Sequence, residues 1–247
     1  MKIIADLHTH TIASGHAYST LKENIEQALL TDLKYLGVSD HTPGMPNTTS
    51  EGYFYNLKVV RNNINGIRVL KGAEANIVDV QGHIDLPVEM MSRLDYVIAS
   101  LHDLVIADMG IAVNTQAVIA AMKNPCVKVI GHPDDSHFPL DYKALASAAK
   151  ATGVALELNN SSLSPHSSRS GGYVNAGKML EQCELAGASI MVGSDSHIWY
   201  DVGGFGYALS LLKQIGFPSN LVINADLIQF EMFMNLSTAR EKTIAVA

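Results

Sequence analysis

Short apolar runs recur along the chain, and most of them end on a polar or charged residue. Such runs between polar loops are typical of strands that are buried on both faces. Six such segments lie at residues 2–5, 68–74, 96–100, 127–130, 154–158 and 189–192. A shorter one begins at Val38 and passes through Ser39 to end at Asp40-His41. We therefore predict seven strands.

The segments between these runs carry apolar residues three or four positions apart, which is typical of amphipathic helices. The clearest helix begins after Thr20, where Thr20 and Glu23 form a capping-box sequence, and it is predicted to end at Gly37. Further helices are predicted over residues 55–63, 114–122, 141–152, 173–186, 204–214 and 226–234, and residues 221–224 are predicted to be extended.

Strands that alternate with helices pair in parallel through right-handed crossovers. No repeat, low-complexity segment or linker interrupts the alternation, so residues 1–247 are predicted to form one domain. Seven strands are one fewer than a closed TIM barrel has. We therefore predict the α/β class, with a distorted seven-stranded β/α (TIM-like) barrel. An open doubly wound sheet would alternate in the same way, but its strand ends lie side by side rather than in a ring.

The composition is that of a globular protein, with 47% hydrophobic and 17% charged residues. No apolar run is long enough to span a bilayer, and the first strand begins too early to leave room for a signal peptide. Cys126 and Cys183 are expected to be free thiols, which suits the cytoplasm. The formal charge of −7, without any cluster of lysine or arginine, argues against an extended nucleic-acid interface.

Metal-binding residue types follow the strands. Because side chains alternate along a strand, His8 and His10 at the end of the first strand point to the same side. Asp6 lies on that side too and is expected to orient a ligand histidine. The arrangement recurs down the chain and gives nine candidate ligands, including seven of the ten histidines: His8, His10, His16, His41, Glu74, His102, His132, Asp195 and His197. All except His16 lie at or just after the carboxyl end of a predicted strand, where β/α barrels carry their active sites.

Nine ligands exceed the four that one tetrahedral site takes, so two or three ions are expected. Imidazoles with a few carboxylates suit zinc, and manganese or iron is also tolerated. Glu74 is the only glutamate at such a strand end and is therefore the candidate that bridges two ions. Multinuclear sites of this kind hold a hydroxide between ions and neutralise the charge that develops on a phosphoryl group.

These motifs resemble those of the PHP (polymerase and histidinol phosphatase) family, in order from residue 6 to residue 197. The matching segments are Asp6-Leu-His-Thr-His10, Ser39-Asp-His41, Gly72-Ala-Glu74, Ser100-Leu-His102, Gly131-His-Pro133 and Gly193-Ser-Asp-Ser-His197. Length and motif context are most similar to the small single-domain YcdX-type phosphatases. The resemblance implies a distorted seven-stranded barrel with a trinuclear site of three Zn2+ ions, with Mn2+ or Fe2+ in some positions. A homo-oligomer, specifically a trimer, would fit it.

Position by position, the resemblance also implies three ligand sets. They are His8, His10, Glu74 and Asp195 for one ion, Glu74, His102 and His132 for the second, and His16, His41 and His197 for the third. Hydroxide bridging the two ions that share Glu74 would attack phosphorus, in line with the leaving alkoxide. The residues to which we assign catalysis are Asp195, Glu74, His197 and Arg169.

Arg169 lies in a loop rich in serine and asparagine, residues 159–172, and is the only arginine between residues 94 and 239. A guanidinium group suits bidentate phosphate binding, and the alternative is an exposed, solvated side chain. Asp40 either hydrogen-bonds a ligand histidine or a bound water, or caps its strand. His83 is a further candidate on the substrate side, whereas surface positions are expected for His137 and His166.

The favoured function is a metal-dependent phosphatase (a hydrolase acting on phosphoric ester bonds) whose partner is a small phosphorylated metabolite. A phosphodiesterase or nuclease would use nearly the same chemistry, but the chain lacks basic patches. A non-catalytic zinc-binding module is the third alternative. An amidohydrolase is the fourth, although its bridging group is normally a modified lysine, and here Glu74 takes that position.

Overall fold

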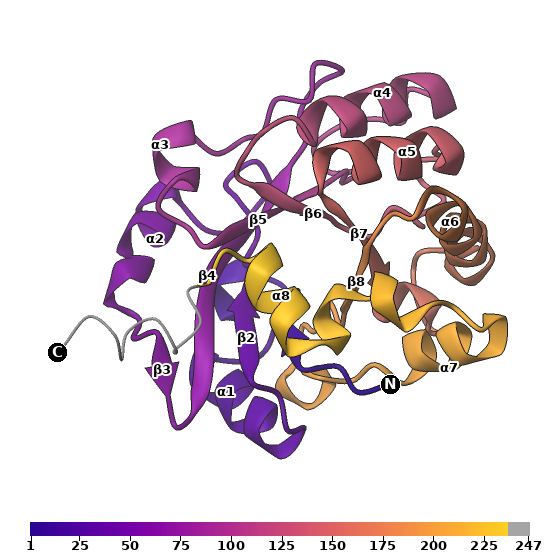
Figure 1. Cartoon of the computed structure of the whole chain (residues 1–247). Coiled ribbons are helices and arrows are strands. Elements are labelled where there is room, and N and C mark those ends of the chain that lie inside the picture. Colours follow the sequence, from indigo (N-terminus) through magenta and orange to yellow (C-terminus); the bar gives the residue numbers. More distant parts are fainter. Residues whose placement is uncertain (237–247) are drawn as a thin grey trace, which may run out of the picture.

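Seven parallel strands form a nearly closed barrel in the computed structural model, which describes residues 1–236 (Figure 1). In order around the barrel they are β1 (Ala5–Asp6), β2 (Tyr35–Val38), β4 (Ile67–Asn76), β5 (Tyr96–Ser100), β6 (Val127–Ile130), β7 (Ala155–Asn159) and β8 (Ile190–Gly193). Every neighbouring pair in this order is parallel. The predicted distorted seven-stranded β/α barrel is confirmed.

Helices surround the ring of strands (Figure 1). They are α1 (Leu21–Leu30), α2 (Glu51–Asn56), α3 (Val88–Met91), α4 (Ile111–Ala121), α5 (Tyr142–Thr152), α6 (Gly172–Ala186), α7 (Gly206–Ile215) and α8 (Leu227–Phe233). Short 3-10 turns are η1 (Ile12–Ser14), η2 (Leu57–Val59), η3 (Ser161–Leu163), η4 (Trp199–Asp201), η5 (Ser219–Leu221) and η6 (Ile223–Ala225). The predicted capping box of α1 is present, because Thr20 and Glu23 satisfy each other's backbone amides. The predicted end of this helix at Gly37 is wrong, because α1 ends at Leu30 and Tyr35–Val38 form β2.

The helix predicted over residues 55–63 is wrong. The helical segment begins earlier, at Glu51, and the chain then turns into a hairpin between β3 (Asn63–Ile64) and β4. Asn65 and Gly66 make the turn with φ values of 53° and 92°. An Asn-Gly pair with two positive φ angles is the strongest short-range hairpin signal, and it outweighs the helical spacing of the preceding residues.

Side chains complete the barrel where β1 and β8 meet. Asn224 donates to the carbonyl oxygens of Ala5 (2.8 Å) and Val192 (2.7 Å), and its own oxygen accepts from the Val192 amide. Asp6 accepts from the amides of Ser194 (3.1 Å) and Gly203 (2.9 Å). The extended segment predicted over residues 221–224 is confirmed only at Val222, which bridges Ile190 in parallel, while its neighbours lie in the 3-10 turns η5 and η6. The expectation for Asp6 is wrong, because Asp6 binds backbone amides rather than orienting a histidine.

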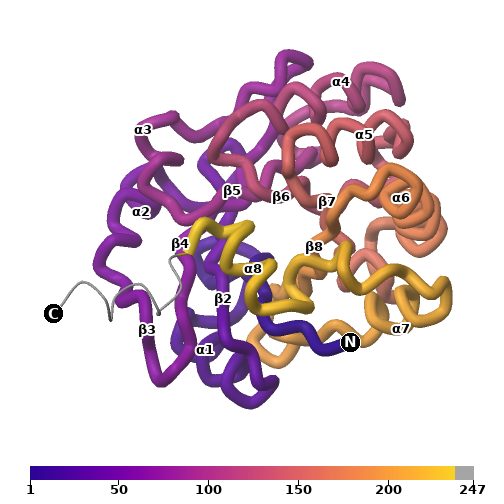
Figure 2. Tube along the Cα trace, viewed as in Figure 1, coloured from indigo at the N-terminus to yellow at the C-terminus, as the bar shows by residue number. Residues whose placement is uncertain are grey.

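The amino-terminal end of the barrel is covered by α8, which crosses in front of the strands (Figure 2). Phe230 is fully buried against Tyr35, with ring centroids 4.8 Å apart. The Asp226 side chain caps the helix by accepting from the Gln229 amide. This end of the molecule is therefore packed, and the polar residues gather at the other end. None of the helices within residues 1–236 has the length and hydrophobicity needed to cross a membrane.

Candidate metal centre

All nine candidate ligands gather at the carboxyl end of the barrel. Eight lie at or just after strand ends, and His16 comes from the loop that follows η1. Their contacts form a connected cluster around Glu74, which is 1% exposed in β4. Two of these residues have left-handed backbone conformations, with φ of 28° at His132 and 55° at Asp195. Such conformations in non-glycine residues cluster at functional sites, where the surrounding structure holds them in place.

The first predicted ligand set has the spacing of a tetrahedral site. His8 Nε2 lies 3.3 Å from Glu74 Oε2 and 3.4 Å from Asp195 Oδ1. His10 Nε2 lies 3.5 Å and 3.4 Å from the same two oxygens. Donors about 2.0–2.1 Å from one zinc ion lie about 3.3–3.4 Å apart in a tetrahedron. The four side chains therefore suit a single ion between them.

The second oxygen of Glu74 faces a different group. His132 Nε2 lies 2.9 Å and His102 Nε2 3.2 Å from Glu74 Oε1, and the two nitrogens are 3.3 Å apart. Ser100 donates to the same oxygen at 2.8 Å. One carboxylate thus presents each of its oxygens to a separate set of donors, which is the geometry a bridging ligand requires.

The third predicted ligand set, His16, His41 and His197, is less compact than the first two. His16 Nε2 and His197 Nε2 are 3.0 Å apart, and the ring centroids of His16 and His41 are 5.0 Å apart. His41 Nδ1 also lies 2.9 Å from Glu74 Oε2. One group of neighbouring ligand atoms joins His41 with His10 and His197, and another joins it with Glu74 and His102. His41 is therefore within reach of more than one ion position.

Unpartnered buried atoms test whether metal fits here. Within residues 1–236, His8 Nε2, His10 Nε2, His41 Nδ1 and Glu74 Oε2 are buried and make no hydrogen bond of acceptable geometry, although His41 Nδ1 and Glu74 Oε2 are 2.9 Å apart. A buried polar atom without a partner costs about 1–3 kcal/mol. Four such atoms that converge on one region would all be satisfied by divalent cations, so the donor set fits zinc or a similar ion.

Glu157 orients His8, and the sequence interpretation missed it. Glu157 Oε1 lies 2.7 Å from His8 Nδ1, while Oε2 accepts from the His132 amide at 2.7 Å. A Cβ at Gly193 would lie 2.1 Å from Glu157 Oε1, so glycine leaves room for this carboxylate. The available signal was a glutamate between two leucines in the middle of a buried strand, β7.

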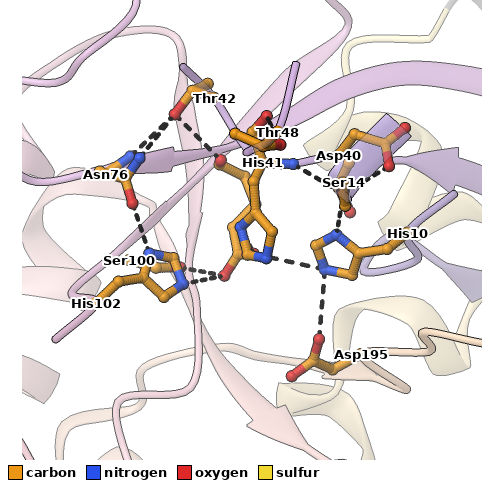
Figure 3. Close-up of polar contacts among 12 residues, drawn as sticks. His10, Ser14, Asp40, His41, Thr42, Thr48, Asn76, Ser100, His102 and Asp195 are labelled. Atoms are coloured by element: carbon orange, nitrogen blue, oxygen red, sulfur yellow. Dashed lines mark hydrogen bonds and ion pairs between the residues drawn. The ribbon is translucent and has the colours of Figure 1, made fainter. Parts of the chain in front are cut away.

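Two further chains of polar contacts orient His10 and His102 (Figure 3). Ser14 Oγ lies 3.0 Å from His10 Nδ1 and donates to Asp40 at 2.7 Å. Asn76 Oδ1 lies 2.7 Å from His102 Nδ1. In each case the contact at Nδ1 leaves Nε2 directed at the cluster, as expected of a metal-binding imidazole. Asp40 thus acts on His10 through Ser14.

The carboxylates at the centre are held ionised by their neighbours. Burial disfavours the charged form of Glu74, but nearby His8 and His102 outweigh it and hold the pKa of Glu74 well below its usual range. Burial likewise opposes ionisation of Asp195, and His8 and Arg169 hold the pKa of Asp195 well below its usual range. Both groups are therefore ready as anionic ligands at neutral pH.

The pKa values of His10 and His8 are shifted in opposite directions by their surroundings. Burial, reinforced by the charge of His197, lowers the pKa of His10 well below its ordinary value, so the imidazole is neutral and free to bind metal. Burial also opposes protonation of His8, but Glu157 and Asp195 outweigh it and raise the pKa of His8 well above its ordinary value. The negative surroundings of His8 favour a cation at this position, and a divalent ion supplies more charge than a proton does.

Arg169 reaches the centre from the loop after β7. Its Nη1 lies 2.8 Å from Asp195 Oδ2, and its Nε lies 3.6 Å from Asp135 Oδ2. Only 19% of the side chain is exposed, so the alternative of a solvated arginine is wrong. His83 lies outside the cluster, where its ring bonds Asp79 at 2.7 Å with the side chain 73% exposed. The expected surface positions of His137 and His166 are confirmed.

Replacing Glu157 with Gln is expected to weaken metal binding about 10- to 100-fold, the usual effect of losing a partner of a ligand histidine. The amide keeps the shape but removes the charge that favours a cation at His8. Competition with a chromogenic chelator would measure the affinity. Glu181→Gln on the exposed face of α6 is the matched control. Equal affinities in both variants would contradict the assigned role.

Comparisons with known proteins identify the family to which the chain is similar. A family model described as PHP domain matches residues 6–161. A probable phosphatase of Clostridium acetobutylicum is 43% identical over 226 residues, which cover 92% of each chain. A probable phosphatase of Thermoanaerobacter sp. is 43% identical over 235 residues, which cover 95% of each chain.

Solved structures share the fold. A histidinol phosphate phosphatase from Lactococcus lactis, crystallised with zinc, L-histidinol and phosphate, superposes with a TM-score of 0.60 at 17% identity. The match covers 88% of this chain and 95% of the other. An amidohydrolase gives a TM-score of 0.54 at 12% identity, covering 96% of this chain and 75% of the other. At these identities the similarity concerns the fold alone.

Proposed function

Because this chain belongs to the PHP domain family, we propose that it is a metal-dependent phosphatase that hydrolyses a small phosphomonoester at a centre of three divalent ions. The observation that carries the proposal is the arrangement of Glu74. Its two oxygens face separate sets of imidazoles, at 3.3–3.5 Å for His8 and His10 and at 2.9–3.2 Å for His132 and His102. The two relatives of nearly equal length are probable phosphatases.

The three ligand sets would hold zinc, with manganese or iron as substitutes at some positions. His8, His10, Glu74 and Asp195 would hold the first ion, Glu74, His102 and His132 the second, and His16, His41 and His197 the third. When bound, such ions lower the pKa of water to supply a nucleophile and neutralise charge on the phosphoryl oxygens.

The chain's own residues prepare the site for the phosphate. Asp195 Oδ1 faces His8 and His10, while its Oδ2 holds Arg169 at 2.8 Å. The guanidinium group is therefore fixed beside the centre by Asp195, with further contacts to Ser162 and Asp135, which leaves its Nη2 to bind a phosphate oxygen. Since Arg169 is always charged, it adds a permanent positive charge against the trigonal phosphoryl group of the transition state.

Replacing Arg169 with Lys is expected to lower kcat/KM for a phosphomonoester about 10- to 100-fold, because a charged hydrogen bond contributes about 1.5–3 kcal/mol. Lysine keeps the charge but loses the planar pair of donors. Bound metal per chain should not change. Steady-state kinetics and elemental analysis measure the two quantities, and Arg93→Lys at an exposed position is the control. Unaltered kinetics would place Arg169 outside the phosphate site.

Matched nitrophenyl esters test the proposed reaction. The protein is expected to cleave 4-nitrophenyl phosphate faster than bis(4-nitrophenyl) phosphate by more than about tenfold, a barrier difference of about 1.4 kcal/mol. A chelator should abolish the activity, and zinc or manganese should restore it. Preferential cleavage of the diester would favour a nuclease instead. A metal-loaded protein that cleaves neither ester would favour a non-catalytic zinc-binding module.

A further inference from the structure

A cavity of about 410 Å3 opens directly over the candidate metal centre. One side of it is lined by candidate ligands, including His16, His41, His102 and His197. A phosphate held by this centre and Arg169 would direct its ester oxygen into the cavity. The cavity is therefore the space that receives the leaving group, and its size is near the lower end of small-molecule sites, about 300–1,000 Å3.

Three of the residues that line the cavity are apolar. Met45 and Pro46, in the loop after β2, and Leu104, in the loop after β5, line the cavity together. The side chain of Leu104 is 67% exposed and is therefore accessible to a ligand in the cavity. The loop that carries Met45 is held in place, because a Cβ at Gly15 would lie 2.0 Å from the carbonyl oxygen of Asn47.

The cavity has few charged side chains that could bind a charged leaving group. Apart from the histidines, Arg169 and Asp195 are the only ionisable residues among its described lining residues, and they are paired with each other at 2.8 Å. A leaving group with an ammonium group would find no free carboxylate there. One with a second anionic group would compete with the phosphate for the single guanidinium.

We propose that the site selects phosphomonoesters whose leaving group is neutral and presents an apolar ring-sized face to Leu104, Met45 and Pro46, with Leu104 as a specificity-determining residue. The inference rests on the proposed phosphatase function and narrows it. The predicted substrates differ in class from amino-alcohol phosphate esters such as histidinol phosphate, for which the Lactococcus phosphatase is named.

Three phosphate esters of primary alcohols test the proposal: benzyl phosphate, glycerol 1-phosphate and 2-aminoethyl phosphate. The wild-type protein should hydrolyse the benzyl ester with a kcat/KM at least about tenfold above that of the aminoethyl ester, since a small apolar contact gives about 10- to 200-fold discrimination. Leu104→Asp should lower kcat/KM for the benzyl ester about tenfold and raise it for the aminoethyl ester. The value for glycerol 1-phosphate should change less than either.

Leu185→Asp is the matched control, because Leu185 is 75% exposed in α6 and lies outside the cavity. It should preserve the wild-type order of the three esters. Equal wild-type rates for benzyl and aminoethyl esters, or an unchanged order in Leu104→Asp, would overturn the inference while leaving the phosphatase function intact. Hydrolysis of none of the three would overturn the proposed function, and this inference with it.

Discussion

Replacing Glu74 with Gln is expected to reduce kcat/KM for a phosphomonoester by about 10³-fold or more. The amide keeps the size of the side chain but presents one acceptor oxygen instead of two, so it cannot serve both sets of imidazoles. Loss of metal charge from the centre removes several kcal/mol of transition-state stabilisation, and about 4 kcal/mol corresponds to a factor of 10³. Steady-state kinetics on a generic phosphomonoester measures the effect.

Glu89→Gln is the control for this substitution, because Glu89 lies exposed in α3, away from the barrel end. Circular dichroism would establish that both variants keep the fold. If Glu74→Gln retained wild-type kinetics with a normal metal content, the bridging role of Glu74 would have to be abandoned.

Replacing Asp195 with Asn is expected to lower kcat about 10²- to 10³-fold. The substitution removes an anionic donor of the first ligand set and also the partner of Arg169, and removing one preorganised group of this kind typically costs about 2.7–4 kcal/mol. Asn is preferable to Ala here because Asp195 has a φ of 55°, a conformation that Asn tolerates better than most residues. The loss of activity would then reflect chemistry rather than backbone strain.

Asp32→Asn provides a matched control for this second variant. Asp32 also has a positive φ, 59°, but it lies on the surface, where it pairs with Lys2. Thermal unfolding of the two Asn variants would show whether the backbone conformation is tolerated equally. Normal turnover of Asp195→Asn, with Arg169 still required, would show that Asp195 does not act in the reaction.

The barrel could be predicted from the sequence because each buried parallel strand is a short apolar run and each connection contains a helix. The errors arose where a few residues override periodicity. The Asn65–Gly66 turn creates the hairpin, and the Asn224 side chain closes the seam that no pattern marks. Such features depend on contacts with residues far away in the sequence, and the spacing of apolar residues does not predict them.

The candidate ligands were predictable because histidines and carboxylates recur at the same end of six of the seven barrel strands. The groups that orient them were harder to find, since they are ordinary polar residues. Glu157 lies 149 positions from His8, the ring that it orients at 2.7 Å. Asp6 shows the converse error, because its place beside the ligand motif indicated an orienting role, whereas backbone amides of the seam take both of its oxygens.

Elemental analysis of protein purified from metal-replete cells tests the trinuclear centre most directly. The proposed ligand sets predict three divalent ions per chain in the wild-type protein, zinc first among them, and fewer in Glu74→Gln. One ion or none in the wild-type protein, with the fold intact, would contradict the trinuclear centre and the mechanism built on it.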